Sequence, residues 1–310
     1  MGHPSGDGGA LTAMTETSTK HVSTPDSSSN GPPTEGRRGG ANLTIEEMRC
    51  LTRAIRRHIV RMTAAAGSGH PGGSLSAVEI LTALYFNVLR HDPHEPDWPA
   101  RDRFILSKGH CTPVLYSTLA EAGYFPVDEL ATFRQMDSQL HGHCHNTTPG
   151  VEHCSGSLGQ GLSVGLGMAL AARLDGSPHN VYVLVGDGEC DEGQIWEAAM
   201  AASHFGVDNL TVIVDRNGIQ NDRWTYEVMN LEPLPDKWRA FGWDVDEVDG
   251  HDLSQMVSAL DNASRRDGRH HVIIARTVKG KGVSFMENNP DFHGKAPNAD
   301  ELRLALEEIG

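Results

Sequence analysis

Two short polar segments, each directly after an apolar run, could hold a cation and an anion side by side. The run VYVLV leads into Asp187 and Gly188 of GDGECDEG, and the run TVIVD leads to Asn217 and Ile219. A carboxylate at 187, an amide oxygen at 217 and the main-chain carbonyl at 219 are the oxygen ligands that Mg²⁺ prefers. Gly188 lets a ligand approach the main chain, and free N–H groups of a following helix favour an anion such as a diphosphate. Two phosphate oxygens and a water would complete the octahedron around the metal.

Other interpretations of GDGECDEG fit less well. Its acidic spacing resembles a calcium loop, but Glu192 stands where that loop requires Gly, and Ala198 stands where it requires Glu. The dinucleotide pattern G-x-G-x-x-G is missing. An acidic first helical turn, stabilised by the helix dipole, would explain Asp191 and Glu192 alone. It would not explain oxygen ligands after two successive strands.

Alternating strands and helices must position these loops. Apolar runs predict strands at 103–106, 181–185, 211–214, 244–248 and 271–275. Helical patterns are predicted near 45–66, 76–88, 113–121, 163–174, 192–205, 231–241, 253–266 and 299–309. Apolar strands that alternate with helices predict an α/β fold with a parallel sheet flanked by helices on both faces. Ligands of such folds bind at the carboxyl ends of the strands, where the polar segments lie.

Composition excludes several classes of function. The 310 residues carry 26 Lys and Arg against 41 Asp and Glu, a net charge of −15. This acidic balance argues against nucleic acid or an anionic membrane as the partner. No run approaches the roughly 20 apolar residues of a membrane span, and the first residues lack a secretion signal. Five Cys without such a signal favour reduced thiols and a cytoplasmic location.

The first part of the chain differs from the rest. Residues 1–41 form a low-complexity run of Ser, Thr, Gly and Pro, in which Met14 is a second candidate start. Such a run buries too little apolar surface to offset its ordering entropy, so we predict a disordered tail. Thr44 and Glu47 have the spacing of a capping box and predict the first helix. Residues 42–310 are therefore predicted to form one domain.

Five motifs occur in order along this domain. They are SGHPGGSLS at 68–76, SKGH at 107–110, GHCHNTTPGVEHCSGSLGQGLS at 142–163, GDG followed by Asn217, and TVKGKGVSFMENNPDFHGKAP at 277–297. Together they resemble the transketolase family over nearly the whole chain after the tail. The resemblance implies the thiamine diphosphate-binding fold, with thiamine diphosphate and Mg²⁺ as cofactors, or Ca²⁺ or Mn²⁺ in place of Mg²⁺. It also implies transfer of a two-carbon ketol unit from a ketose to an aldose, or between their phosphates, with the cofactor ring as electron sink.

The resemblance further implies roles for individual residues. His70, His143 and His293 would face the ketol hydroxyls, since neutral imidazole both donates and accepts hydrogen bonds. His110 and His293 would lie near the cofactor diphosphate, and Glu192 resembles the acidic residue that links the two active sites of the dimer. The expected catalytic residues are His70, His110, His143, His293 and Glu192. The expected cofactor-binding residues are His110, Gly156, Ser157, Leu158, Asp187, Gly188, Glu189, Asn217 and His293, of which Gly156 to Leu158 would touch the thiazolium–pyrimidine part. The expected metal ligands are Asp187, Asn217 and Ile219.

The segment 141–154 holds four His and two Cys and also suggests zinc. Structural zinc sites usually pair ligands as C-x₂₋₄-C and H-x₃₋₅-H. Here Cys144 and Cys154 are ten residues apart and the first three His are spaced by two, which fits poorly. The family usually has Pro where Cys144 stands, a departure that could alter the pocket entrance.

Family members that work alone carry two further domains. One of these supplies the Glu that activates the aminopyrimidine of the cofactor and the aromatic residues that stack on it. The sequence has no room for them before Gly310. The resemblance therefore implies the diphosphate-binding N-terminal subunit of a split transketolase. Its partner would be a C-terminal subunit, in a heterotetramer, and the arginines that clamp the sugar phosphate would lie in that partner.

Two other classes of function stay open. A different thiamine diphosphate enzyme, such as a 2-oxo acid dehydrogenase alpha subunit or a specialised biosynthetic ketol transferase, shares the GDG pattern. The ordered SGHPGG, SKGH and SLGQG motifs favour ketol transfer, for example among sugar phosphates of the pentose phosphate pathway. A non-catalytic scaffold derived from the family is the second alternative, and intact His110, Asp187 and Asn217 argue against it.

Overall fold

The computed structural model describes residues 2, 42–221 and 223–310. Apart from Gly2, the predicted tail of residues 1–41 lies outside these ranges. Within the described part of the chain, no helix is long and apolar enough to cross a membrane.

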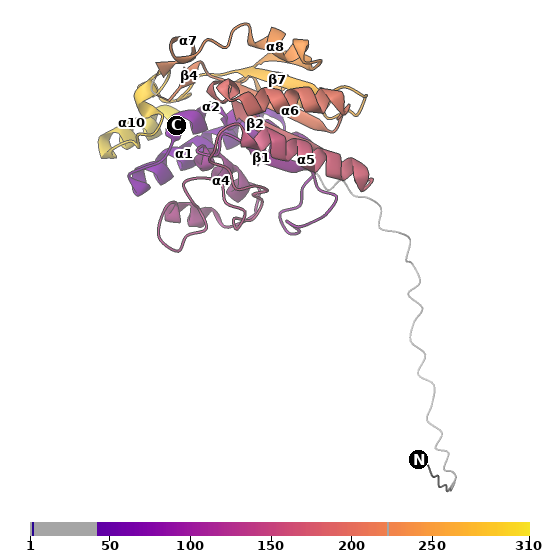
Figure 1. The fold of residues 1–310 in the computed structure, drawn as a ribbon. Helices are drawn as coiled ribbons and strands as arrows, with labels where there is room; N and C mark the ends of the chain where they lie inside the picture. The colour runs from indigo at the N-terminus through magenta and orange to yellow at the C-terminus, as the bar shows by residue number, and fades with distance from the viewer. Residues whose placement is uncertain (1, 3–41, 222) are drawn as a thin grey trace, which may run out of the picture. The chain divides into compact units, whose positions relative to one another are not determined.

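A five-stranded parallel sheet forms the centre of the fold (Figure 1). Its strands, in spatial order, are β1 (Arg103–Leu106), β2 (Val181–Gly186), β3 (Leu210–Arg216), β7 (His271–Arg276) and β6 (Asp244–Asp249). All four neighbouring pairs are parallel, so the carboxyl ends of the strands share one edge. In this register Gly186 pairs with Asp215, and Asp215 pairs with Ala275. The predicted α/β fold with a parallel sheet is confirmed.

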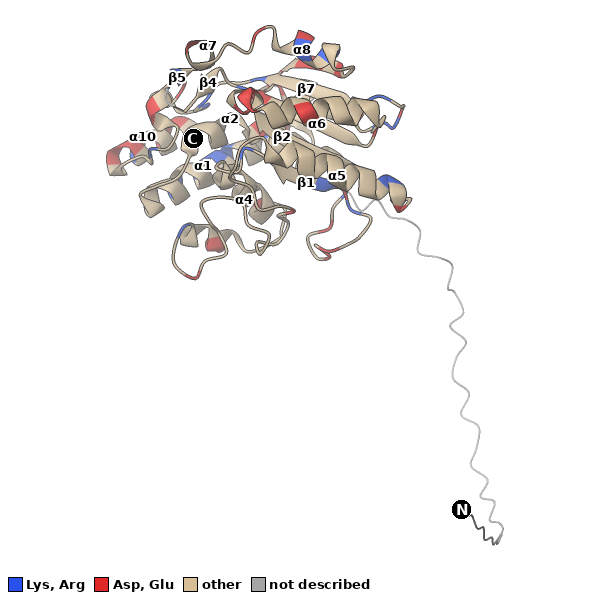
Figure 2. Cartoon of the chain, in the orientation of Figure 1, with Lys and Arg blue, Asp and Glu red and all other residues tan. Residues whose placement is uncertain are grey.

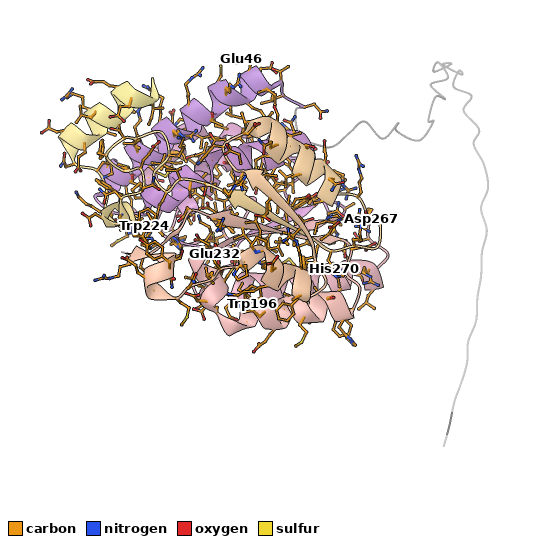
Figure 3. All side chains as sticks on the ribbon, turned by 90° about the horizontal axis from the view of Figure 1, so that it is seen from above. Glu46, Trp196, Trp224, Glu232, Asp267 and His270 are labelled. Atoms are coloured by element: carbon orange, nitrogen blue, oxygen red, sulfur yellow. The ribbon has the colours of Figure 1, made fainter. Side chains whose placement is uncertain are left out.

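Helices cover both faces of the sheet, because side chains of each strand point alternately to its two sides. Figure 3, seen from above, shows the strands between the two helix layers. One core packs strand side chains such as Leu184 against α1 (Ile45–Ala66), α3 (Val78–Ala83), α4 (Thr112–Glu121), α9 (Leu253–Ala263) and α10 (Ala299–Ile309). The other packs side chains such as Val183 and Val185 against α5 (Gln160–Leu174), α6 (Gly193–His204) and α8 (Leu234–Ala240).

Short elements complete the fold. They are α2 (Pro71–Ser76), the π-helix η1 (Leu84–Val88), the 3₁₀ helices η2 (Val127–Thr132), η3 (Gly188–Asp191) and η4 (Pro290–Phe292), the hairpin strands β4 (Ile219–Gln220) and β5 (Arg223–Trp224), and α7 (Thr225–Val228). The predicted capping box is confirmed: Thr44 accepts from the Glu47 N–H and Glu47 accepts from the Thr44 N–H at the start of α1.

Two expectations about elements were wrong in detail. The predicted helix 76–88 begins earlier, at Pro71, and is divided into α2, α3 and η1, with a break at Ala77. Proline suits a first helical turn, and burial of α2 outweighs the low helix propensity of its two glycines. The strand predicted as buried at 244–248 is an edge strand, and Val248 is its buried residue.

Candidate active site

A cavity of about 220 Å³ opens at the carboxyl ends of the strands, and we call it the central cavity. Loops that follow β1, β2, β3 and β7 contribute to it, together with α2 and the loop before α5. Its lining residues are His70, Gly73, Lys108, His110, His143, Gly156, Leu158, Gly186, Asp187, Gly188, Glu189, Asn217, Ile219, Gln220, Asn221, Lys279 and His293. Five sequence motifs that are far apart in the chain therefore meet at one edge of the sheet.

Four histidines predicted as catalytic are brought together in the central cavity. The ring centroid of His70 lies 5.0 Å from that of His110, 6.1 Å from that of His143 and 5.3 Å from that of His293. Burial and the charge of Arg134 lower the pKa of His70 to about 4, and burial and Lys279 lower that of His293 to about 3. The pKa values of His110 and His143 are also lowered by burial. The cluster is therefore neutral near pH 7 and can both donate and accept hydrogen bonds.

The three predicted metal ligands lie at the ends of β2 and β3. The Asp187 carboxylate accepts hydrogen bonds from the N–H groups of Gly188 (2.9 Å) and Gly218 (2.6 Å). The bond to Gly218 holds the carboxylate beside the end of β3. The side-chain oxygen of Asn217 accepts from the N–H of Ile219 (3.1 Å). Burial and the nearby Asp215 raise the pKa of Asp187 to about 6.

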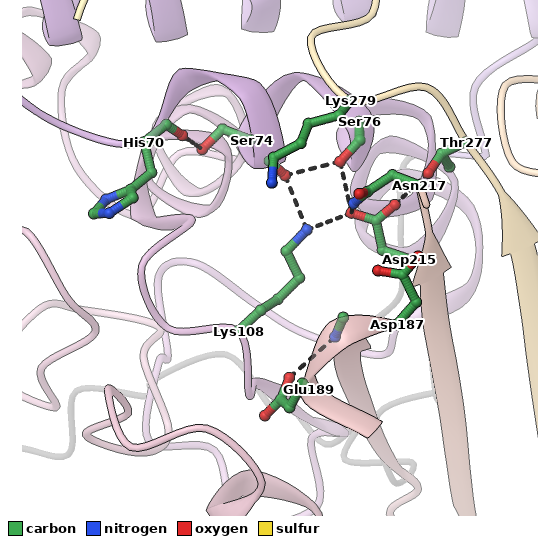
Figure 4. Close-up of polar contacts among 12 residues, drawn as sticks. His70, Ser74, Ser76, Lys108, Asp187, Glu189, Asp215, Asn217, Thr277 and Lys279 are labelled. Atoms are coloured by element: carbon green, nitrogen blue, oxygen red, sulfur yellow. Dashed lines mark hydrogen bonds and ion pairs between the residues drawn. The ribbon is translucent and has the colours of Figure 1, made fainter. Parts of the chain in front are cut away.

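A buried ion pair between Lys108 and Asp215 lies beside these ligands, and sequence reasoning missed it (Figure 4). Asp215 also accepts hydrogen bonds from Ser76 (2.6 Å) and Thr277, which come from α2 and from the loop after β7. Lys108 donates to the carbonyl of Gly73 (3.0 Å) as well. The pair therefore joins segments from four parts of the chain beneath the cavity. The signal for it was a Lys inside SKGH, directly after an apolar strand.

Lys279 is the second cation that sequence reasoning missed. Its ammonium donates to the Ile219 carbonyl (3.1 Å) and to Nδ1 of His293 (2.8 Å). Because that nitrogen accepts, the proton of neutral His293 lies on Nε2. Burial and the charge of Lys108 lower the pKa of Lys279 to about 8.

Three predicted residues occupy other surroundings. Glu189 lines the cavity, but its carboxylate already accepts from Ser107, from the Gly159 N–H (2.8 Å) and from the Gly186 N–H (3.0 Å). Ser157 and Glu192 are exposed and are absent from the lining, whereas Gly156 and Leu158 belong to it. Glu192 precedes α6 and packs close to Gly159, where an added Cβ would lie 2.7 Å from the Glu192 Cβ.

The His- and Cys-rich segment 141–154 forms no zinc cluster in the described residues, where no three His, Cys, Asp or Glu side chains are arranged to hold a metal. His143 is the residue of this segment that lines the central cavity, and neither cysteine of the segment belongs to the lining. Cys144 packs in the hydrophobic core beside α4 rather than at the cavity.

The central cavity fits an anion next to a divalent cation. Two buried ammonium groups, Lys108 and Lys279, face one cavity, and the lowered pKa of Lys279 means that a negative ligand would stabilise its charge. The raised pKa of Asp187 means that a cation would stabilise its carboxylate. The buried Nδ1 atom of His70, a residue that lines the cavity, has no hydrogen-bond partner among the described residues. These groups suit a diphosphate bridged by a metal to strand-end oxygen ligands.

Fold and site thus define a cofactor-binding α/β domain. Residues 48–310 match the family model described as "Transketolase, thiamine diphosphate binding domain". The chain belongs to the transketolase family. The predicted resemblance to this family is confirmed, and so is the prediction that the chain belongs to a transketolase enzyme.

Relatives and solved structures agree with this assignment. The chain is 47% identical over 270 residues to an apulose-4-phosphate transketolase subunit of Actinobacillus succinogenes, covering 86% of this chain and 98% of that protein. It is 46% identical over 256 residues to a 6-deoxy-6-sulfo-D-fructose transketolase subunit of a Clostridium species, covering 82% of this chain and 93% of that protein. The Campylobacter jejuni transketolase structure matches with a TM-score of 0.81 at 32% identity, covering 86% of this chain but 43% of that one. The chain therefore spans less than half of the solved transketolase and nearly all of the two relatives named as transketolase subunits.

Proposed function

We propose that this chain is the N-terminal subunit of a two-chain transketolase that moves a two-carbon ketol unit from a ketose phosphate to an aldose phosphate. The observation that carries the proposal is the neutral four-histidine cluster directly beside the strand-end oxygen ligands. Relatives that are matched over nearly their whole length carry names of transketolase subunits, which supports the same conclusion.

The cofactor would be held by groups of this chain. Asp187, Asn217 and the Ile219 carbonyl would bind Mg²⁺, or Ca²⁺ or Mn²⁺ in its place, while His110 and Lys279 would contact the diphosphate. When bound, thiamine diphosphate supplies the electron sink for breaking and forming the carbon–carbon bond. Gly156, Ser157 and Leu158 would contact its rings. Gly188 would contact the diphosphate through its main chain, and an added Cβ there would lie 2.8 Å from Gln220, so a larger residue would disturb the cavity wall. Glu189 would support the site by fixing three loops rather than by contacting the cofactor.

The sugar would meet the histidine cluster. Neutral His70 and His143 can donate to a carbonyl oxygen or accept from a hydroxyl, and the Nε2–H of His293 can donate, so the cluster can move protons as the ketol unit is released and accepted. Sugar phosphates of carbohydrate metabolism, including those of the pentose phosphate pathway, are the proposed substrates.

A second polypeptide would cover the outer face of α5 and α6. This face is largely uncharged (Figure 2) and exposes Leu174, Met200 and Phe205, which are 88%, 57% and 53% exposed. Apolar surface gathered on two neighbouring helices indicates a protein interface. The proposed partner is a C-terminal transketolase subunit, in a heterotetramer. Glu192, which directly precedes α6, would link the two active sites of that assembly. A cytoplasmic location fits the five free cysteines.

The test is reconstitution. The full chain is copurified with a candidate C-terminal transketolase subunit from the same genome, and two-carbon transfer from a ketose phosphate to an aldose phosphate is measured with thiamine diphosphate and MgCl₂. We expect transfer that chelation of the metal abolishes, and no oxidation of pyruvate in a dye-reduction assay. Asp187→Ala should abolish both transfer and metal-dependent cofactor binding, whereas Asp191→Ala, outside the cavity lining, should retain them. No transfer by the parent pair, or unchanged cofactor affinity of Asp187→Ala in calorimetry, would refute the proposal.

A further inference from the structure

A buried charge network behind the central cavity has no part in the proposed chemistry. Arg56 of α1 and Glu79 of α3 form a two-point ion pair, with N···O distances of 2.7 and 2.9 Å. The Nδ1 atom of His251, in the loop between β6 and α9, lies 2.9 Å from the same carboxylate. Arg56 and Glu79 are each 7% exposed, and none of the three residues lines the central cavity.

The two outer ends of this network hold one loop. Nε of Arg56 donates to the carbonyl of Lys281 (3.0 Å), and the N–H of Val278 donates to Nε2 of His251 (2.8 Å). A main-chain N–H can only donate, so Nε2 of His251 accepts and its Nδ1 carries the proton. Nδ1 therefore donates to Glu79, which has to be a carboxylate to accept from both neighbours. Burial would raise the pKa of Glu79, but Arg56 and His251 outweigh it and lower that pKa to about 2.

The held loop, residues 277–282, carries groups of the site (Figure 4). Thr277 donates to the Asp215 carboxylate, and Lys279 reaches the Ile219 carbonyl and His293. Between the two anchored residues, the Gly280 N–H donates to the Gly72 carbonyl of α2 (2.9 Å). The anchors at Val278 and Lys281 therefore lie on either side of Lys279, and they determine where its ammonium enters the cavity.

We propose that Arg56, Glu79 and His251 are positioning residues that clamp the loop 277–282 and thereby set the affinity of the site for its diphosphate cofactor. The proposal rests on the proposed function, because it takes Lys279 to serve the cofactor anion. Residues that orient the ligands of a metal site typically change affinity by about 10- to 100-fold when they are removed, and we expect an effect of similar size here. Loss of the clamp should therefore weaken cofactor binding more than it lowers turnover at saturating cofactor.

The first test measures the loop itself, in the full chain without cofactor. Glu79→Gln keeps the shape of the side chain and removes its charge. Glu152→Gln is the matched control. The Glu152 side chain is also mostly buried, and it forms an ion pair with Arg101, outside the loop 277–282. In hydrogen–deuterium exchange we expect faster exchange across 278–282 in Glu79→Gln and parent-like exchange in Glu152→Gln. Unchanged exchange of the loop in Glu79→Gln would overturn the proposal.

The second test separates the two hydrogen bonds of His251 and also serves if Glu79→Gln fails to fold. In His251→Gln the amide oxygen can take the place of Nε2 and accept from Val278. In His251→Asn the amide matches Nδ1, which keeps the donor to Glu79 and loses the bond to Val278. Titration of the reconstituted pair with thiamine diphosphate in MgCl₂ should show a loss of about tenfold or more for His251→Asn and a smaller loss for His251→Gln. Equal affinities of the two variants and the parent would contradict the clamp. Failure of the parent pair to bind the cofactor would instead refute the proposed function, and loop exchange would still decide the positioning role.

Discussion

Lys108 and Asp215 form an ion pair whose side chains are 3% and 0% exposed, at the point where β1 and β3 end. Burial alone would lower the pKa of Lys108, but the Asp215 carboxylate outweighs it and raises that pKa. The same carboxylate accepts from Ser76 and Thr277, so one pair of charges connects α2 with the loop after β7. The ion pair therefore connects the loops that form the site and fixes their relative positions.

Removing one partner of this pair should be costly. Lys108→Met leaves a buried carboxylate without its cation, and we expect a loss of about 3–5 kcal/mol in the free energy of unfolding. The double variant Lys108→Met/Asp215→Asn removes both charges and should recover a substantial part of that loss. Urea unfolding of the three proteins measures the difference. A double variant no more stable than Lys108→Met would show that the ion pair is not the source of the effect.

The histidine cluster should make the cofactor-free protein sensitive to acid. The pKa of His70 is about 4 in the folded chain, below its ordinary value of 6.5, because of burial and the charge of Arg134. The folded state thus favours the neutral ring. Its contribution to stability is complete above pH 6.5 and is lost as the pH falls from 6.5 toward 4. His70→Asn should reduce the drop in the urea midpoint between pH 7.5 and pH 5, and His204→Asn, on the exposed surface of α6, should not. Equal drops in both variants would count against this assignment.

Gly280 should tolerate no side chain. Its φ is +83°, and an added Cβ would collide with the Met286 carbonyl. Gly176 is a matched control, with φ +63° and open space around its Cβ position. Gly176→Ala should cost about 1–2 kcal/mol from the left-handed conformation alone. Gly280→Ala should cost about 1–3 kcal/mol more from overpacking, and should weaken cofactor binding because Lys279 is adjacent. Calorimetric melting of both variants gives the comparison, and similar melting temperatures would disprove the predicted collision.

The outer face of α5 and α6 should be needed for binding the proposed partner. Met200→Glu places a charge on this face, and we expect it to weaken association at least tenfold without lowering the melting temperature of the free chain. Met136, 92% exposed in the loop after η2, supplies the control Met136→Glu. Light scattering and titration calorimetry of the mixed subunits measure association. If Met200→Glu binds the partner as tightly as Met136→Glu does, the interface lies elsewhere.

The fold and the proximity of Asp187 to Asn217 could be predicted because they depend on local patterns. Asp187 and Asn217 each directly follow an apolar strand, and parallel strands bring such positions to one edge. The family motifs predicted which histidines would gather. The Lys108–Asp215 pair could not be predicted in this way, because it depends on β1 and β3 both bordering β2, which periodicity does not specify. Lys279 was missed for a similar reason, since only the folded loop brings it to Ile219. For Ser157 and Glu192 the motif match gave a role, but the described chain alone gives them no contact with the central cavity.

The spatial order of the strands also bears on how the protein is made. β7 lies between β3 and β6, although both of those strands precede it in the chain. During synthesis, β6 therefore has no place beside β3 until the segment His271–Arg276 has emerged from the ribosome. Pairings over such long separations in sequence form slowly and leave strand edges open in the meantime. The nascent polypeptide should thus depend on protection by chaperones until the segment that forms β7 has been made, late in translation.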